Sequence, residues 1–167
     1  PENVYVTMDK MNREGAVNAG RGSYKAAQVA SRMITETKAK IRKLVHVDVS
    51  SAVVFSPSIT IAMNQIINGL GLRQKAVVYV SPYEHNAVAR SLYELSKKKK
   101  FIIKELPLNE GMEIDIEKMK YEFSKDKPEA VFCTHVSNVT GYILPIKDIF
   151  REAKRHGSIN ILDSVSY

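Results

Sequence analysis

Short apolar runs alternate with amphipathic stretches along most of the chain. Five runs of four to seven mostly apolar residues are long enough for buried strands. They occupy residues 52–55, 76–80, 101–106, 130–136 and 158–162. Continuous apolar runs, as opposed to strict apolar–polar alternation, are typical of parallel strands that are covered on both faces.

Apolar residues at helical spacing separate these runs. Ala27, Ile34 and their neighbours keep to one face of a helix expected over residues 23–47. Asp115 is placed to cap a later helix, and Gly157 to end another in the left-handed conformation. The further helices are expected over residues 60–68, 85–97, 116–123 and 146–153.

The alternation predicts an α/β fold with a mostly parallel sheet and helices on both faces. The first residues fit this rhythm less well. We therefore expect residues 1–17 to be the remnant of an N-terminal or small-domain segment. Residues 18–167 are expected to form the N-terminal part of a larger domain.

The composition is that of an ordinary globular protein, with 44% hydrophobic and 26% charged residues. No apolar run approaches the roughly 20 residues that span a bilayer, and the start of the chain has no signal-peptide pattern. These features predict a cytoplasmic protein without a membrane partner. Cys133 is the single cysteine, so we expect neither disulfides nor a metal site, and we interpret Cys133 as a core residue.

The net charge of +7 raises the question of a nucleic-acid partner. Basic residues are scattered, however, apart from the lysines at positions 97–100. Those lysines follow an amphipathic stretch, where cations favour the carboxyl end of the helix dipole. A solvated helix end is the better interpretation, and no nucleic acid is expected.

Polar segments follow the predicted strands. Ligands of parallel sheets collect at the carboxyl ends of the strands. That rule places residues 56–60, 81–85, 137–141 and Asp163 along one edge, which we call the rim.

Each rim segment has a functional and a structural interpretation. The turn before Thr60 suits a phosphate, but serine and threonine there are also common helix caps. His85 could lie on an aromatic ring or exchange protons, or be a capping or surface residue. Asn138 could orient a carboxylate or simply sit in a polar loop. Asp163 ends an apolar strand, where a carboxylate needs a cationic partner or serves as a cap.

The order and spacing of these segments resemble the class V aminotransferases, which use pyridoxal 5'-phosphate (PLP). The matching residues are Thr60 followed by Asn64, Glu84-His85, Ser137 to Gly141, and Asp163. The Glu-His and Ser-Asn-Val-Thr-Gly motifs point to the cysteine desulfurase and selenocysteine lyase branch. Residues 18–22 are similar to the Asn-Pro-x-Arg stretch of that family.

The resemblance implies the large domain of a fold-type I PLP-dependent transferase, and a role for each rim residue. The backbone N–H of Ile59 and the hydroxyl of Thr60 would hold the cofactor phosphate. His85 would stack on the ring and move protons, as a catalytic residue. Asn138 would contact the phenolic side of the cofactor or the substrate carboxylate, and Asp163 would pair with the pyridine nitrogen. Arg21 would bind substrate near the mouth of the site.

The resemblance also implies an activity for the whole protein. The expected reaction converts L-cysteine into L-alanine and leaves the sulfur on the enzyme, with a small amino acid as substrate. A homodimer and a sulfur-acceptor protein are implied partners. The alternatives are a class V aminotransferase or lyase acting on another amino acid, and a non-catalytic binding or scaffold protein with the same fold.

The chain departs from the family pattern in three respects. Pro57, Ser58 and Ile61 replace its Gly-rich turn and a following glutamate, and Ser166 replaces a glutamine. The lysine that carries the cofactor follows the strand-ending aspartate in the family, whereas no lysine here follows Asp163. We therefore expect this chain to be truncated before that lysine and to be inactive by itself.

Overall fold

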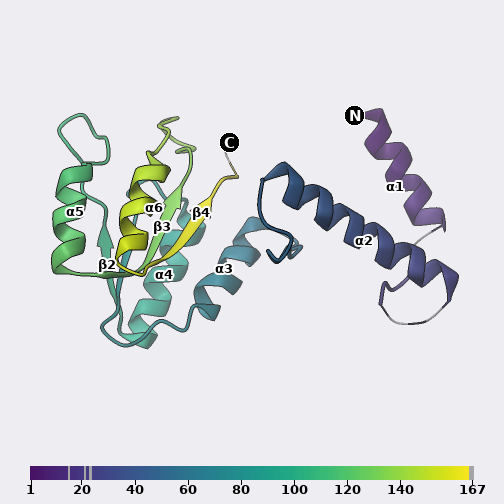
Figure 1. Cartoon of the computed structure of the whole chain (residues 1–167), viewed down its shortest axis with the longest axis horizontal. Coiled ribbons are helices and arrows are strands. Elements are labelled where there is room, and N and C mark those ends of the chain that lie inside the picture. Colours follow the sequence, from purple (N-terminus) through teal and green to yellow (C-terminus); the bar gives the residue numbers. More distant parts are fainter. Residues whose placement is uncertain (15, 21, 23, 166–167) are drawn as a thin grey trace. The chain divides into compact units, whose positions relative to one another are not determined.

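The computed structural model describes residues 1–14, 16–20, 22 and 24–165 (Figure 1). In this part, six helices and four strands follow one another in the order α1 (Glu2–Glu14), α2 (Lys25–Leu44), α3 (Ile59–Gly69), β1 (Val77–Val80), α4 (Asn86–Lys99), β2 (Ile102–Glu105), α5 (Ile116–Lys125), β3 (Pro128–Thr134), α6 (Ile146–Arg155) and β4 (Ile159–Asp163).

The chain divides into two compact units, residues 1–55 and residues 56–167. In the first unit, α1 buries no side chain and α2 buries Ala27 and Ala30. The loop after α2 is held by Arg42, whose Nε donates to the Ser51 carbonyl at 2.7 Å. The domain division expected after residue 17 concerns the longer protein and stays a prediction.

The second unit is built on a parallel sheet with the strand order β2-β1-β3-β4. This confirms the α/β fold class and four of the five expected strands. Because β1 pairs with β2 on one side and with β3 on the other, the strand order reverses at β1. Crevices at such reversal points are where open parallel sheets bind ligands.

Helices cover both faces of the sheet, as expected (Figure 1). On one face, α3 and α4 pack Met63, Ile67 and Leu92 against strand residues such as Phe132. On the other face, α5 and α6 pack against a second set of strand residues. That set is Tyr79, Val131 and Cys133. Two buried faces explain why the strands are apolar at consecutive positions instead of alternate ones.

The expected strand over residues 52–55 is wrong. This segment belongs to no strand, and Val54 is 78% and Phe55 54% exposed. A strand requires hydrogen-bonded neighbours, and the segment has none in the described part of the chain. An apolar run is therefore necessary for a buried strand but not sufficient.

Local signals at helix ends are confirmed. The Asp115 side chain accepts a hydrogen bond from the Lys118 N–H at 2.9 Å and caps α5. Gly157 follows α6 with a φ of 79°, and three lysines lie in the last turn of α4. No helix among the described residues combines the length and apolarity required to cross a membrane.

Phe123 on α5 provides a test of this packing. Its side chain is 0% exposed, and its ring meets that of Tyr79 edge-on at 4.7 Å. We expect Phe123→Ala to lower the free energy of unfolding by about 3–5 kcal/mol, since it opens a cavity between α5 and the sheet. Urea denaturation measures this loss.

Tyr121→Ala is the matched control on the same helix, since Tyr121 is 59% exposed. This variant should lower the free energy of unfolding by less than about 1 kcal/mol. Equal losses in the two variants would contradict the packing of α5 described above.

Candidate functional site

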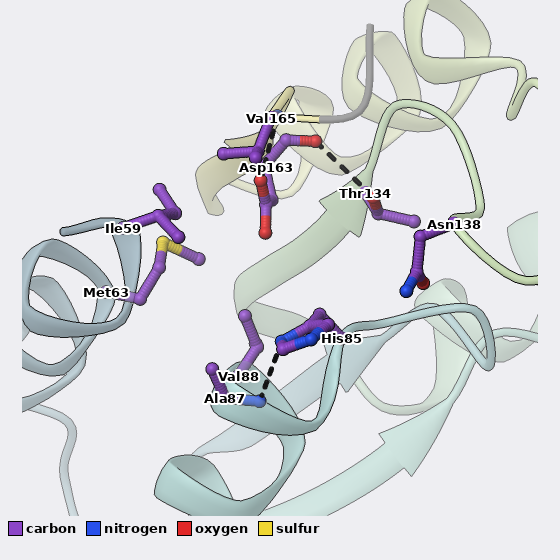
Figure 2. A pocket seen from close by; sticks show the side chains of 9 residues that line it. All are labelled: Ile59, Met63, His85, Ala87, Val88, Thr134, Asn138, Asp163 and Val165. Atoms are coloured by element: carbon purple, nitrogen blue, oxygen red, sulfur yellow. Dashed lines mark hydrogen bonds between the residues drawn. The ribbon is translucent and has the colours of Figure 1, made fainter.

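A pocket of about 210 Å³ opens at the rim, between the carboxyl ends of the strands and the start of α3 (Figure 2). Its walls combine an apolar side with a few polar groups, the composition expected of a small-molecule site. The lining residues are Ile59, Met63, His85, Ala87, Val88, Thr134, Asn138, Asp163 and Val165.

Four of the residues proposed from the sequence line this one pocket: Ile59, His85, Asn138 and Asp163. Thr60 follows Ile59 in the first turn of α3 but is not among the lining residues. The proposed substrate residue Arg21, and Ser166 in the place of the family glutamine, lie outside the described residues.

The pocket reaches the amino end of α3. Ser58 caps this helix, because its Oγ accepts a hydrogen bond from the Ile61 N–H at 3.3 Å. The N–H groups of Ile59 and Thr60 have no acceptor within the helix, as in the first turn of any helix. They and the positive end of the helix dipole suit an anion such as a phosphate.

His85 has two structural roles at once. It is the N-cap of α4, since its Nδ1 accepts a hydrogen bond from the Ala87 N–H at 3.2 Å, and its ring borders the pocket (Figure 2). With Nδ1 as acceptor, the neutral imidazole carries its proton on Nε2. The capping interpretation is therefore correct, and the cap fixes the tautomer of the ring beside the pocket.

Asn138 lies in a loop that Ser137 holds together. Ser137 is 3% exposed, its Oγ accepts from the Thr140 N–H at 3.2 Å, and its carbonyl accepts from the Gly141 N–H at 2.9 Å. A φ of 74° at Gly141 completes the turn, which a residue with a side chain rarely adopts. The exposed Asn138 amide stands near His85 (Figure 2).

Asp163 is the buried charge of the site. The residue is 7% exposed, and its carboxylate points into the pocket from the end of β4 (Figure 2). Its Oδ1 accepts from the Val165 N–H at 3.1 Å. No lysine, arginine or histidine of the described residues forms an ion pair with it. A buried carboxylate without a cation is costly, so the pocket favours a cationic ligand.

Glu84 is not a lining residue but contacts one, Thr134, and the sequence analysis assigned it no role of its own. Its Oε1 accepts hydrogen bonds from the Ser81 hydroxyl, at 2.6 Å, and from the Thr134 N–H. Its Oε2 is buried without a partner among the described residues. Burial raises the pKa of Glu84 to about 7, with a further contribution from Asp163, although its two hydrogen bonds act in the opposite direction. The one signal was its place in the Glu-His motif.

The described residues contain no group of three or more histidine, cysteine or acidic side chains that could hold a metal ion. Cys133 is confirmed as a core residue, since it is 0% exposed. Burial, followed by the nearby charge of Glu84, raises the pKa of its thiol well above the usual value. It is therefore not a nucleophile of this site.

Known proteins with similar sequences and folds are cysteine desulfurases and related enzymes. A probable cysteine desulfurase of Halalkalibacterium halodurans is 28% identical over 166 residues, which is 98% of this chain and 41% of the relative. The apo cysteine desulfurase of Thermococcus onnurineus NA1 superposes with a TM-score of 0.89 at 22% identity, over 98% of this chain and 41% of that one.

A mutant of C-DES with glycine covalently linked to its PLP cofactor is a more distant structural neighbour. Its TM-score is 0.73 at 15% identity, with 96% of this chain and 40% of that chain covered. The chain thus spans about two fifths of the length of the proteins it matches. The likeness to solved structures confirms the expected fold.

A family-level comparison also covers the whole chain. The model of the family described as Aminotransferase class-V matches residues 1–167, so that the helices of the first unit and the rim of the second fall within one match. The resemblance seen in the rim motifs is thereby confirmed, and the chain belongs to the class V aminotransferase family.

Proposed function

We propose that the pocket binds PLP and that the whole protein is a PLP-dependent enzyme acting on an amino acid, with L-cysteine desulfuration as its reaction. The observation that carries this proposal is Asp163, a buried carboxylate that faces the pocket and has no cation beside it among the described residues. The names of the relatives and the family support the choice of cofactor and reaction.

The volume and the lining of the pocket suit a substituted aromatic ring. A cavity of roughly 150 Å³ is enough for benzene, and this one measures about 210 Å³. Met63, Val88 and Val165 offer apolar contacts, and His85 offers a second ring. Asp163 would hold the pyridine nitrogen in its protonated form, because the cation and the buried carboxylate stabilise each other.

The amino end of α3 is the place for the phosphate group. Ile59 borders the pocket, and its N–H and that of Thr60 belong to the first turn of the helix. Pro57 and Ser58 replace the Gly-rich turn of the family. The Ser58 cap nevertheless occupies only the N–H of Ile61, which leaves the two earlier groups for the phosphate.

The remaining polar groups would act on the substrate. When bound, PLP supplies an electron sink for the bond that breaks in an amino acid. The Nε2–H of His85 can donate a hydrogen bond to the substrate at the pocket wall, because the Ala87 N–H occupies Nδ1 and leaves the proton of the neutral ring on Nε2. The amide of Asn138 can donate to a carboxylate or accept from an ammonium group.

The partners and location of the whole protein stay predictions. They are a small amino-acid substrate, a homodimer, a sulfur-acceptor protein and the cytoplasm. A transaminase or lyase activity is the alternative on the same fold, and a scaffold that binds no cofactor is the alternative of another class.

Asp163→Asn tests the cofactor site. The amide keeps an oxygen that can accept from the Val165 N–H but loses the charge for the pyridine nitrogen. We expect the whole protein to bind PLP about 10- to 100-fold more weakly after this change, the loss of one charge-assisted hydrogen bond. Titration of the absorption band of the bound cofactor gives the Kd.

Asp126→Asn is the matched control, because Asp126 lies just before β3, at the end of the strand away from the rim, and pairs with Lys104. Its Kd for PLP should equal that of the wild type. A wild-type protein that leaves the spectrum of PLP unchanged would overturn the proposal and favour the scaffold alternative.

His85→Asn tests the reaction. Asparagine is a good N-cap, so α4 should keep its start while the imidazole is lost. We expect the whole protein with PLP to form alanine and sulfide from L-cysteine under reducing conditions, and the variant to do so about 100-fold more slowly or worse.

The products separate the possible activities. A keto acid formed instead of alanine would indicate an aminotransferase. Bound PLP without any product from L-cysteine would reject desulfuration and point to another amino acid. A variant as fast as the wild type would show that His85 has no part in the reaction.

A further inference from the structure

The hydrogen-bond ladder between β1 and β3 stops short at the rim. Its last regular bond runs from the Ser81 N–H to the Phe132 carbonyl at 2.9 Å. In a regular parallel ladder, the Thr134 N–H would donate next to the Ser81 carbonyl. That carbonyl instead accepts from the Glu84 N–H at 3.3 Å, which closes the turn after β1.

The side chain of Glu84 takes the place of the missing acceptor. Its Oε1 accepts from the Thr134 N–H and also from the Ser81 hydroxyl. Both donor residues are buried, Ser81 with 2% and Thr134 with 7% exposure. Without this carboxyl oxygen, two buried donors would lose their acceptor, at the point where the strand order reverses.

His85 follows Glu84 directly and begins α4. Its backbone is therefore tied through Glu84 to the end of β3, and its ring is tied by Nδ1 to the Ala87 N–H. Thr134, the other partner of Glu84, is itself a lining residue of the pocket. We propose that Glu84 is a positioning residue, whose carboxyl group replaces one bond of the β1–β3 ladder and thereby sets where His85 meets the pocket. The relevance of this role for the cofactor rests on the proposed function.

The groups of the described residues that interact with Glu84 are acidic or neutral. Asp163 faces it from β4, Cys133 from β3 and Ser81 from the end of β1. No ion pair joins it to a lysine, arginine or histidine of the described residues, and its Oε2 is buried without a partner there. These conditions hold its pKa at about 7, so ionisation near neutral pH strengthens the bonds to both donors.

Two variants of the whole protein separate the acceptor from the charge. Glu84→Gln keeps an oxygen for the two donors and removes the titration, whereas Glu84→Ala removes both. Glu105→Gln is the matched control, since Glu105 is an exposed glutamate at the end of the neighbouring strand β2. All measurements below are made without cofactor as well as with PLP.

Amide exchange at Thr134 tests the bond itself. In protein labelled with 15N-threonine, we expect exchange of the Thr134 N–H to become at least about tenfold faster in Glu84→Ala and to stay near the wild-type rate in Glu84→Gln and Glu105→Gln. The Thr140 N–H, bonded to the Ser137 hydroxyl at 3.2 Å, is the internal reference. Unchanged exchange at Thr134 in Glu84→Ala would overturn the proposal.

The tautomer of His85 tests positioning, which a merely structural role would not affect. 15N-histidine spectra of the neutral ring should show the proton on Nε2 in the wild type. We expect a mixture of tautomers in Glu84→Ala and recovery of the Nε2–H form in Glu84→Gln. The same tautomer in all three proteins would show that Glu84 does not position His85.

The pH dependence of stability tests the setting of Glu84 even if the Glu84→Ala variant does not fold. The pKa of Glu84 is about 7 in the folded state, against 4.5 for an ordinary glutamate side chain. The folded state therefore binds the extra proton, and stability is lost as pH rises through 7. Between pH 5 and pH 8, the unfolding equilibrium constant should rise roughly 50- to 100-fold more in the wild type than in Glu84→Gln. Parallel curves would contradict the burial of Glu84 without an ion pair to the described residues.

The PLP titration distinguishes the two proposals. If PLP binds, Glu84→Ala should weaken it several-fold and Glu84→Gln should restore it. If PLP does not bind to the wild type, the proposed function fails. The Thr134 exchange and the His85 tautomer, read without cofactor, still decide the role of Glu84.

Discussion

Parallel pairing of β1, β3 and β4 is the constraint on which the site depends. The two faces of this sheet are filled by α3 and α4 on one side and by α5 and α6 on the other. Polar side chains can therefore reach a ligand only beyond the strand ends. Because parallel strands end at the same edge, residues as far apart in sequence as His85 and Asp163 come to line one small pocket.

The same edge concentrates negative charge. Glu84 and Asp163 both carry buried carboxyl oxygens, and the described residues supply no cation to either. Such an arrangement opposes folding and favours any cation that enters the pocket. Functional sites often lower the stability of the free protein in this way, and binding of the ligand then restores it.

Local patterns predicted most of the fold and part of the site. Apolar runs located β1 to β4, and Asp115 and Gly157 marked helix ends, because these features depend on neighbouring residues. The run at residues 52–55 was misjudged, since a strand also requires a partner that no local pattern shows. The order of the motifs predicted that His85 and Asp163 share a site. The burial of the Glu84 side chain against Thr134 was not predictable in this way, because it depends on the register of β1 against β3. A glutamate in a turn otherwise looks like an exposed residue.

The burial of Cys133 has a practical consequence. It is the single thiol of these 167 residues. It lies on β3, where its side chain is buried between the sheet and the helices α5 and α6. A thiol reagent can reach it only when these layers separate. The rate at which Cys133 is alkylated therefore reports how often the sheet opens, at one native atom and without an engineered cysteine.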